Sequence, residues 1–213
     1  MASSSTDSPT TRDKILAASG DLFSERGYLG ASTRDIADRV GIRQPSLFHH
    51  FQTKAAIMAE LQRLDFVPTI ELIERLVQSS APSAVRLYHY LSADVRRILT
   101  FPFETRASTS RAVLNDPALS EGRRLYDQLQ GLQTKLIAAG VEDNSYVAVD
   151  PQFASRTIEW MVEGVLVDAH RQQGLDAATF ADELASFALR SLLREPLDLD
   201  GIRQQANQLF DDQ

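Results

Sequence analysis

The stretch from Thr33 to Lys54, which reads TRDIADRVGIRQPSLFHHFQTK, constrains the fold of this chain more than any other segment. Apolar residues recur at helical spacing on both sides of Gly41, so the sequence predicts two short helices joined by a tight turn. The second of these helices leaves a row of polar side chains on its outer face: Arg43, Gln44, Ser46, His49 and His50. Such a layout is typical of a helix-turn-helix, in which the second helix enters the major groove of DNA.

The residues before this stretch complete a small three-helix head. An apolar stripe predicts a first helix from Thr11 to Arg26, which Gly27 is expected to end. Ser32 or Thr33 is expected to cap the second helix. The sequence predicts one shared apolar core for the three helices, made of Leu22, Phe23, Ile36, Val40, Leu47, Phe48 and Phe51.

The rest of the chain also has the pattern of helices. Only 10 Gly and 8 Pro interrupt 213 residues, so we expect an all-α protein of about nine to ten helices. Pro68 should kink or split the helix that begins at Lys54, and Gly140 should end a later one. We expect a disordered leader at residues 1–10, the head at 11–54 and a larger helical body at 55–213. The predicted body helices span residues 54–76, 83–100, 104–115, 118–139, 151–173 and 179–194, followed by one weak turn near 202–210.

The charges of the chain are unevenly distributed. The formal net charge is -7, which by itself argues against a nucleic-acid partner. Residues 1–54 nevertheless hold seven Lys or Arg against six Asp or Glu, whereas the remainder holds 15 against 23. No acid lies between Arg39 and Lys54. The pattern fits a DNA-binding head on an acidic body, although chance clustering on a solvated face would produce the same counts.

Several classes of protein are disfavoured by what the sequence lacks. Without cysteine there is neither a disulfide framework nor a thiolate metal site. No apolar run approaches the roughly 18 residues that span a membrane, and the polar start MASSSTDSPTT has no signal-peptide core. No HExxH, GxSxG or glycine-rich phosphate loop occurs. We therefore expect a cytoplasmic protein that is not an enzyme and has no membrane partner, cofactor or metal.

The head resembles the TetR (tetracycline-repressor-like) family of bacterial transcriptional regulators over roughly residues 11–60. The resemblance rests on many matches at fixed spacing: Thr33, Ile36, Ala37, Val40-Gly41-Ile42, Pro45-Ser46-Leu47-Phe48, His50-Phe51 and Lys54. It implies that residues 11–54 bind DNA as a helix-turn-helix, whereas residues 55–213 bind a ligand and form a dimer. The family often has Tyr where this chain has Phe48, so one hydroxyl contact to phosphate is missing.

The resemblance also assigns roles to individual residues of the head. Arg43, Gln44, Ser46 and His49 match positions that reach base edges or nearby phosphates. Thr33, His50 and Lys54 match positions that touch the DNA backbone. The chemistry agrees, because Arg pairs with guanine and Gln with adenine through two hydrogen bonds each. The alternative for each of these side chains is plain solvation.

Two further sets of residues are candidates for ligand binding and dimerisation. Aromatic walls with a few polar groups suit a small organic effector, although aromatics at helical spacing are more often ordinary core. The candidate effector residues are Tyr88, Asp94, Arg97, Phe103, Tyr126, Trp160 and Glu163. The late helices carry broad apolar stripes that suit a four-helix interface between two subunits, or else are internal. The candidate interface residues are Ile158, Met161, Val165, Leu184, Phe187 and Ser191.

Taken together, these patterns predict a ligand-responsive transcriptional regulator, most simply a repressor. It would bind a palindromic operator in double-stranded DNA as a homodimer and be released by a small organic effector. An activator would have the same sequence features. One alternative is a helical protein-interaction or ligand-sensing module with a weakened DNA-binding head, for which Phe48 is the only support. A more remote alternative is an enzyme, against which the absence of catalytic motifs argues.

Overall fold

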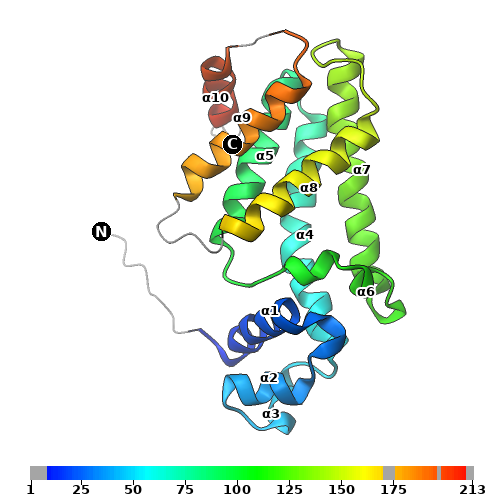
Figure 1. The fold of residues 1–213 in the computed structure, drawn as a ribbon, viewed down its shortest axis with the longest axis vertical. Coiled ribbons are helices and arrows are strands. Elements are labelled where there is room, and N and C mark those ends of the chain that lie inside the picture. The colour runs from blue at the N-terminus through cyan, green and yellow to red at the C-terminus, as the bar shows by residue number, and fades with distance from the viewer. Residues whose placement is uncertain (1–8, 170–175, 196–197, 210–213) are drawn as a thin grey trace. The chain divides into compact units, whose positions relative to one another are not determined.

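The computed structural model describes residues 9–169, 176–195 and 198–209, and side chains of 165–169 are outside that description (Figure 1). The described residues form ten α-helices and two short 3-10 helices, which confirms the predicted all-α class. The elements are α1 (Thr11–Gly30), α2 (Thr33–Val40), α3 (Gln44–His50), α4 (Lys54–Gln78), α5 (Ser83–Thr100), η1 (Arg106–Thr109), α6 (Arg111–Leu114), η2 (Pro117–Leu119), α7 (Ser120–Glu142), α8 (Pro151–Ala169), α9 (Ala177–Leu192) and α10 (Leu199–Gln208). Most of the predicted leader, residues 1–8, lies outside the described residues.

The chain divides into two compact units. The first contains residues 1–65 and 102–126, and the second contains 66–101 and 127–213. The long helix α4 therefore contributes to both units. The predicted division at residue 54 concerns DNA-binding and effector-binding roles, and it stays a prediction.

Local capping explains where the first helices begin and end. The Thr10 hydroxyl and the Asp13 carboxylate form a capping box at the start of α1. Ser32 and Asp35 form a second one at the start of α2, so Ser32 is the cap of that helix. Gly41 ends α2 in the left-handed region with φ of 77°, where its N–H donates to the end of the helix. Gly41 therefore forms the tight turn that separates α2 from α3.

The core of the first unit draws on α1 to α4 and on the short helices after α5. Its buried members include the predicted Leu22, Phe23 and Ile36 and also Val113 and Leu119 from α6 and η2, whereas the predicted Val40 is only partly buried against it. Leu47 of α3 is fully buried, and Phe51, which directly follows this helix, is 5% exposed. The prediction that Phe48 is a core residue is wrong, because its side chain is 41% exposed. Leu47 and Phe51 lie one helical turn apart, so Phe48 points to another side of the helix.

The second unit is organised around α5, which packs against α8, α9 and α10 (Figure 1). Val95 of α5 contacts Ala181 and Leu184 of α9, and Met161 of α8 packs on the same cluster. Pro68 lies inside α4 without splitting it, contrary to one of the two outcomes expected for it. The helix α7 also continues past Gly140 to Glu142, so Gly140 does not end it.

Within the described residues, no helix is long and apolar enough to cross a membrane.

Candidate nucleic-acid interface

The outer face of α3 is exposed because this segment packs against the rest of the first unit through only two apolar side chains. Leu47 and Phe51 are buried in the core of the first unit. Pro45 lies in the first turn, where its missing N–H costs no hydrogen bond. The remaining side chains of this helix and its cap include five exposed residues, Arg43, Ser46, Phe48, His49 and His50.

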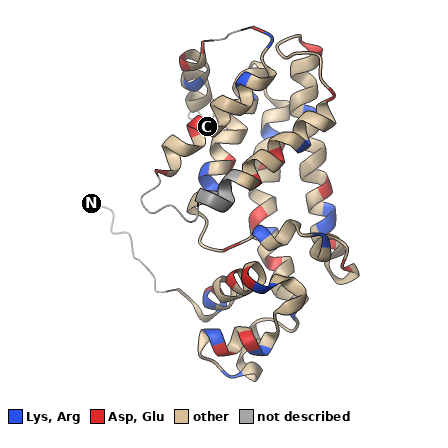
Figure 2. Ribbon diagram, viewed as in Figure 1, with Lys and Arg blue, Asp and Glu red and all other residues tan. Residues whose placement is uncertain are grey.

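Two arginines of the head, Arg39 and Arg26, are paired with acids, whereas Arg43 is not. Arg39 binds both carboxylate oxygens of Glu25, at 3.1 and 2.9 Å, and Arg26 lies 3.3 Å from Asp35. The hydrogen bonds from Arg39 lower the pKa of the Glu25 carboxyl. In contrast, no hydrogen bond or ion pair involves the Arg43 guanidinium in the described part of the chain. Figure 2 shows no acidic residue on α3, so an anion could approach Arg43 without repulsion from that helix.

Gln44 is oriented by the neighbouring helix. Its Nε2 donates a hydrogen bond of 2.9 Å to the Thr33 hydroxyl at the start of α2. Both side chains are half-buried, which restricts their rotamers. The bond uses one of the two N–H groups of the amide, so the second N–H and the carbonyl oxygen stay available for the two-point contact that adenine requires.

Lys54 is held inside the head rather than projecting from it. Its Nζ donates to the carbonyl oxygens of Tyr28 at 2.7 Å and Ala31 at 2.8 Å, and it lies 4.4 Å from the centre of the Tyr28 ring. Burial lowers the pKa of Lys54, while the charge of Asp116 opposes that shift. The lysine thus links the end of α1 to the first residue of α4.

Residues 15–61 match the sequence profile of the bacterial regulatory proteins of the tetR family. Over 125 residues the chain is 30% identical to the biofilm operon icaADBC HTH-type negative transcriptional regulator IcaR of Staphylococcus aureus. It is also 41% identical over 56 residues to the HTH-type transcriptional repressor KstR2 of Mycolicibacterium smegmatis. The chain belongs to the TetR family.

The likeness in structure extends over both units, whereas the likeness in sequence does not. The solved structure of Mycobacterium smegmatis AmtR matches this TetR-family chain with a TM-score of 0.81 and 27% identity, over 96% of this chain and 97% of that one. The match to IcaR covers 59% of this chain and only 64% of that regulator. The match to KstR2 covers 26% and 27%. The family consists of regulatory proteins rather than enzymes.

The structure brings only some of the candidate effector residues of this TetR-family protein together. Asp94 and Arg97 form an ion pair at 3.3 Å, and Asp94 also accepts a hydrogen bond of 2.7 Å from Thr69. Tyr88 instead donates to Asp182, and burial together with that carboxylate raises the pKa of Tyr88 to about 12. Trp160 is 67% exposed. Of the other candidates, Glu163 is exposed in the second unit, while Phe103 and Tyr126 belong to the first.

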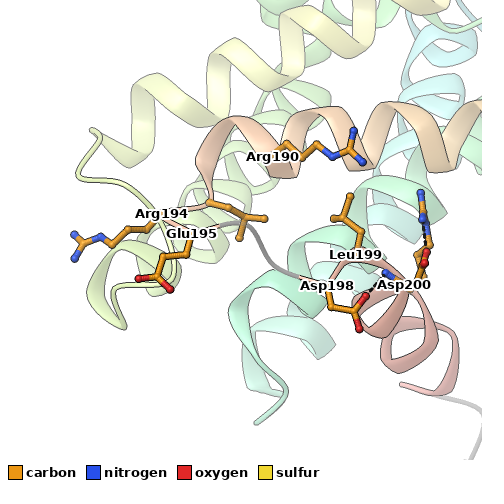
Figure 3. A pocket seen from close by; sticks show the side chains of 8 residues that line it. Arg190, Arg194, Glu195, Asp198, Leu199 and Asp200 are labelled. Carbon is orange, nitrogen blue, oxygen red and sulfur yellow. Dashed lines mark hydrogen bonds and ion pairs between the residues drawn. The ribbon is translucent and has the colours of Figure 1, made fainter.

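A hollow of about 740 Å³ lies between the end of α9 and the start of α10 (Figure 3). Arg203 is bound there to Asp182 and Asp200, and the Arg194 side chain extends away from Asp198 and Asp200. The residues that line the hollow are Arg190, Leu193, Arg194, Glu195, Asp198, Leu199, Asp200 and Arg203. No aromatic side chain occurs among them, so this hollow differs from the aromatic-walled site that the sequence predicts.

The candidate interface residues divide between the inside and the outside of the second unit. Ile158 and Leu184 are buried there, at 8% and 7% exposure, and Met161 packs on the same core. These three side chains are therefore occupied within the subunit. Phe187 is 68% exposed and Ser191 is exposed. The side chain of Val165 lies outside the described residues.

Sequence reasoning missed two features of these helices. Phe153 is a second exposed aromatic residue of α8, at 60%. Gln130, Gln133 and Ser155, to which the sequence assigned no role, each have a buried polar atom without a hydrogen bond in the described part of the chain. The signal that could have identified Gln130 and Gln133 is their spacing of three, which puts two amides on one side of α7. In the described part of the chain, no group of three or more His, Asp or Glu is arranged to hold a metal ion.

Proposed function

We propose that this protein is a ligand-responsive transcriptional repressor that acts in the cytoplasm and binds a palindromic operator as a homodimer. The single observation that carries the proposal is the exposed, acid-free face of α3, with an unpaired Arg43, on a head of the TetR family. Its relatives are described as a negative transcriptional regulator and a transcriptional repressor. The alternative of an interaction module without DNA binding is not favoured, because Phe48 alone supports it.

The proposed contacts divide into those that read sequence and those that only position the head. Arg43 donates two hydrogen bonds to guanine O6 and N7, and Gln44, held by Thr33, contacts adenine N6 and N7. The other contacts go to phosphates or nearby base edges through Ser46, His49, His50 and the backbone at the start of α4. Lys54 stabilises the start of α4 through its hydrogen bonds to the carbonyl oxygens at the end of α1.

Fluorescence anisotropy with DNA from upstream of the protein's own gene tests the DNA-binding part. We expect Arg43→Ala to lose about 1–3 kcal/mol of preference for that DNA over unrelated duplex. Lys135→Ala is the matched control, because Lys135 is an exposed cation of α7 in the second unit. Measurements at two salt concentrations separate the sequence-independent phosphate term. Unchanged preference in the Arg43→Ala variant would contradict the assignment of α3 as the recognition helix.

The dimer is proposed to form through the outward faces of α8 and α9. Trp160 and Phe187 are 67% and 68% exposed, and such large apolar side chains on neighbouring outer surfaces are typical of subunit interfaces. Ile158, Met161 and Leu184 would then support this face from inside the subunit. A two-fold axis would place two α3 helices about 34–36 Å apart, one turn of DNA.

Sedimentation velocity tests the dimer. We expect Phe187→Glu to shift the protein toward monomer, because a buried carboxylate without a partner is costly. Leu29→Glu is the control, since Leu29 is a 76% exposed leucine of the head. A Phe187→Glu variant that stays dimeric would show that this face of α9 is not the interface.

A further inference from the structure

One hydrogen bond joins the first residue of α2 to the first residue of α3. The Gln44 Nε2 donates to the Thr33 hydroxyl at 2.9 Å, and both side chains are half-buried. None of Arg43, Ser46 and His49 forms a side-chain hydrogen bond in the described part of the chain. Of the four side chains expected near base edges, Gln44 is therefore the one whose orientation the protein itself restrains.

The turn between α2 and α3 holds the two partners of this bond at a fixed separation. Gly41 ends α2 in the left-handed region, and the Ile42 N–H donates back to the Ala37 carbonyl oxygen at 3.0 Å. Ala37 of α2 and Leu47 of α3 are both buried in the core of the first unit. The hydrogen bond thus connects two helices that are already packed together, so it restricts the amide without having to draw the helices into place.

The orientation of the amide decides which base it can recognise. The Gln44 nitrogen faces Thr33, which leaves its Oε1 and one N–H for a ligand. This pair matches adenine, whose N6 amino group donates and whose N7 accepts. Guanine presents two acceptors there, O6 and N7, and would place O6 against the amide oxygen. The opposite orientation of the amide would present two N–H donors and suit guanine instead.

The proton of the Thr33 hydroxyl is left for a partner outside the protein. No hydrogen bond in which this hydroxyl donates occurs among the described residues. The neighbouring Asp35 carboxylate accepts from Ser32 and Arg26 instead. A phosphate oxygen of DNA is charged and accepts a hydrogen bond more strongly than a neutral amide carbonyl does. If Thr33 donates to a phosphate, only its acceptor side faces Gln44, which keeps the amide nitrogen turned toward it.

We propose that Thr33 determines base specificity: by orienting the Gln44 amide, it makes the protein select adenine over guanine at one base pair of each operator half-site. This inference rests on the proposed function, since it concerns the same DNA interface. It differs from a simple backbone contact, because the loss of a phosphate contact weakens binding to all sequences about equally. Thr33 is thus a positioning residue whose effect appears at a single base pair.

Selection from a random library of duplexes by the wild-type protein supplies the DNA for the test. Fluorescence anisotropy then measures the affinity for the selected duplex and for its single-base replacements. Gln44→Ala identifies the base pair that Gln44 contacts, because preference should be lost there and kept elsewhere. At that base pair we expect the wild type to bind adenine about tenfold more tightly than guanine. Purine, which lacks the N6 amino group, and 7-deazaadenine, which lacks N7, should each bind more weakly than adenine.

Thr33→Val keeps the shape of the side chain but removes the hydroxyl. We expect this variant to prefer adenine by less than about threefold at the same base pair, with its preferences at other base pairs unchanged. Thr33→Ser retains a hydroxyl and should keep the wild-type preference. Thr11→Val is the matched control, because Thr11 is an exposed threonine that also begins a helix with a capping box. Circular dichroism checks that each variant is folded.

The outcomes separate this inference from the proposed function. A Thr33→Val variant that keeps the adenine preference but binds all duplexes more weakly would overturn the inference and make Thr33 a phosphate contact only. Equal wild-type affinity for adenine and guanine at the base pair that depends on Gln44 would also overturn it, as would a Gln44→Ala variant that loses no preference. In these cases DNA binding itself stands. If the wild type selects no sequence from the library, the proposed function fails.

Discussion

Replacing Lys54 by Met separates a structural role of this lysine from a contact with DNA. The resemblance to the TetR family places the residue on the DNA backbone, whereas its Nζ donates to the Tyr28 and Ala31 carbonyl oxygens at 2.7 and 2.8 Å. Methionine keeps most of the apolar stem but removes the charge and all its donors. If these hydrogen bonds stabilise the fold, the variant should have a lower free energy of unfolding.

The size of the effect follows from these contacts. A hydrogen bond to a charged group contributes about 1.5–3 kcal/mol, and a cation above an aromatic ring adds about 0.5–1 kcal/mol. The burial that lowers the pKa of Lys54 shows that desolvation offsets part of the gain. We expect Lys54→Met to lower the free energy of unfolding by about 2–4 kcal/mol, which shifts the urea midpoint by about 1–2 M.

Urea unfolding followed by circular dichroism measures the loss, and hydrogen exchange of the α1 amides locates it. Lys14→Met is the control, because Lys14 is an exposed lysine of α1 and its replacement should change stability by less than about 0.5 kcal/mol. The reasoning is refuted if Lys54→Met keeps the wild-type midpoint while its DNA affinity falls and the salt slope drops by about one. That result would make Lys54 a phosphate contact only.

Three further substitutions test the stability of the two units. Gly20→Ala would place a Cβ 2.3 Å from the Glu104 carbonyl oxygen, so we expect the free energy of unfolding to fall by about 1–3 kcal/mol, measured by thermal unfolding. Gly131→Ala is the control, because a Cβ there would have nothing within 4 Å, and it should stabilise the protein by about 0.5–1 kcal/mol. Asp182→Asn should destabilise at neutral pH because hydrogen bonds from Arg203 lower the pKa of Asp182. The stability that the Asp182 carboxylate contributes is fully present above the unfolded carboxyl pKa of about 3.9 and is lost as the pH falls through the lower folded pKa. In urea unfolding, the difference in free energy of unfolding between wild type and Asp182→Asn should therefore shrink in acid. An equal difference at pH 7 and at about pH 3 would contradict this prediction.

Local patterns were sufficient for most of the fold. The helix over residues 83–100 is found with its predicted limits, and Ser32 and Gly41 occupy the predicted cap positions. Such signals depend on residues within one or two helical turns of each other, so they can be recognised from the sequence alone. Gly140 shows where they fail. A Cβ at Gly140 would lie 2.1 Å from the Tyr146 ring, so the residue permits a long-range contact within a helix instead of ending it.

Phe48 illustrates a second limit of sequence reasoning. In a seven-residue helix, Leu47 and Phe48 are both compatible with an apolar pair that includes Phe51, since the spacings are four and three. Only the packing of the first unit selects Leu47 for the core and leaves Phe48 41% exposed. Phe48 is exposed, as are Arg43 and His49, so a hydroxyl at this position, which the family often has, would be exposed as well.

The late helices show why periodicity cannot divide a broad apolar stripe into core and interface. The spacing places Ile158 and Leu184 on apolar faces correctly, but it does not reveal that both are already buried within the subunit, Leu184 in a cluster with Val95 of α5. The aromatic residues that remain outside, Trp160 and Phe187, are then available for a partner subunit.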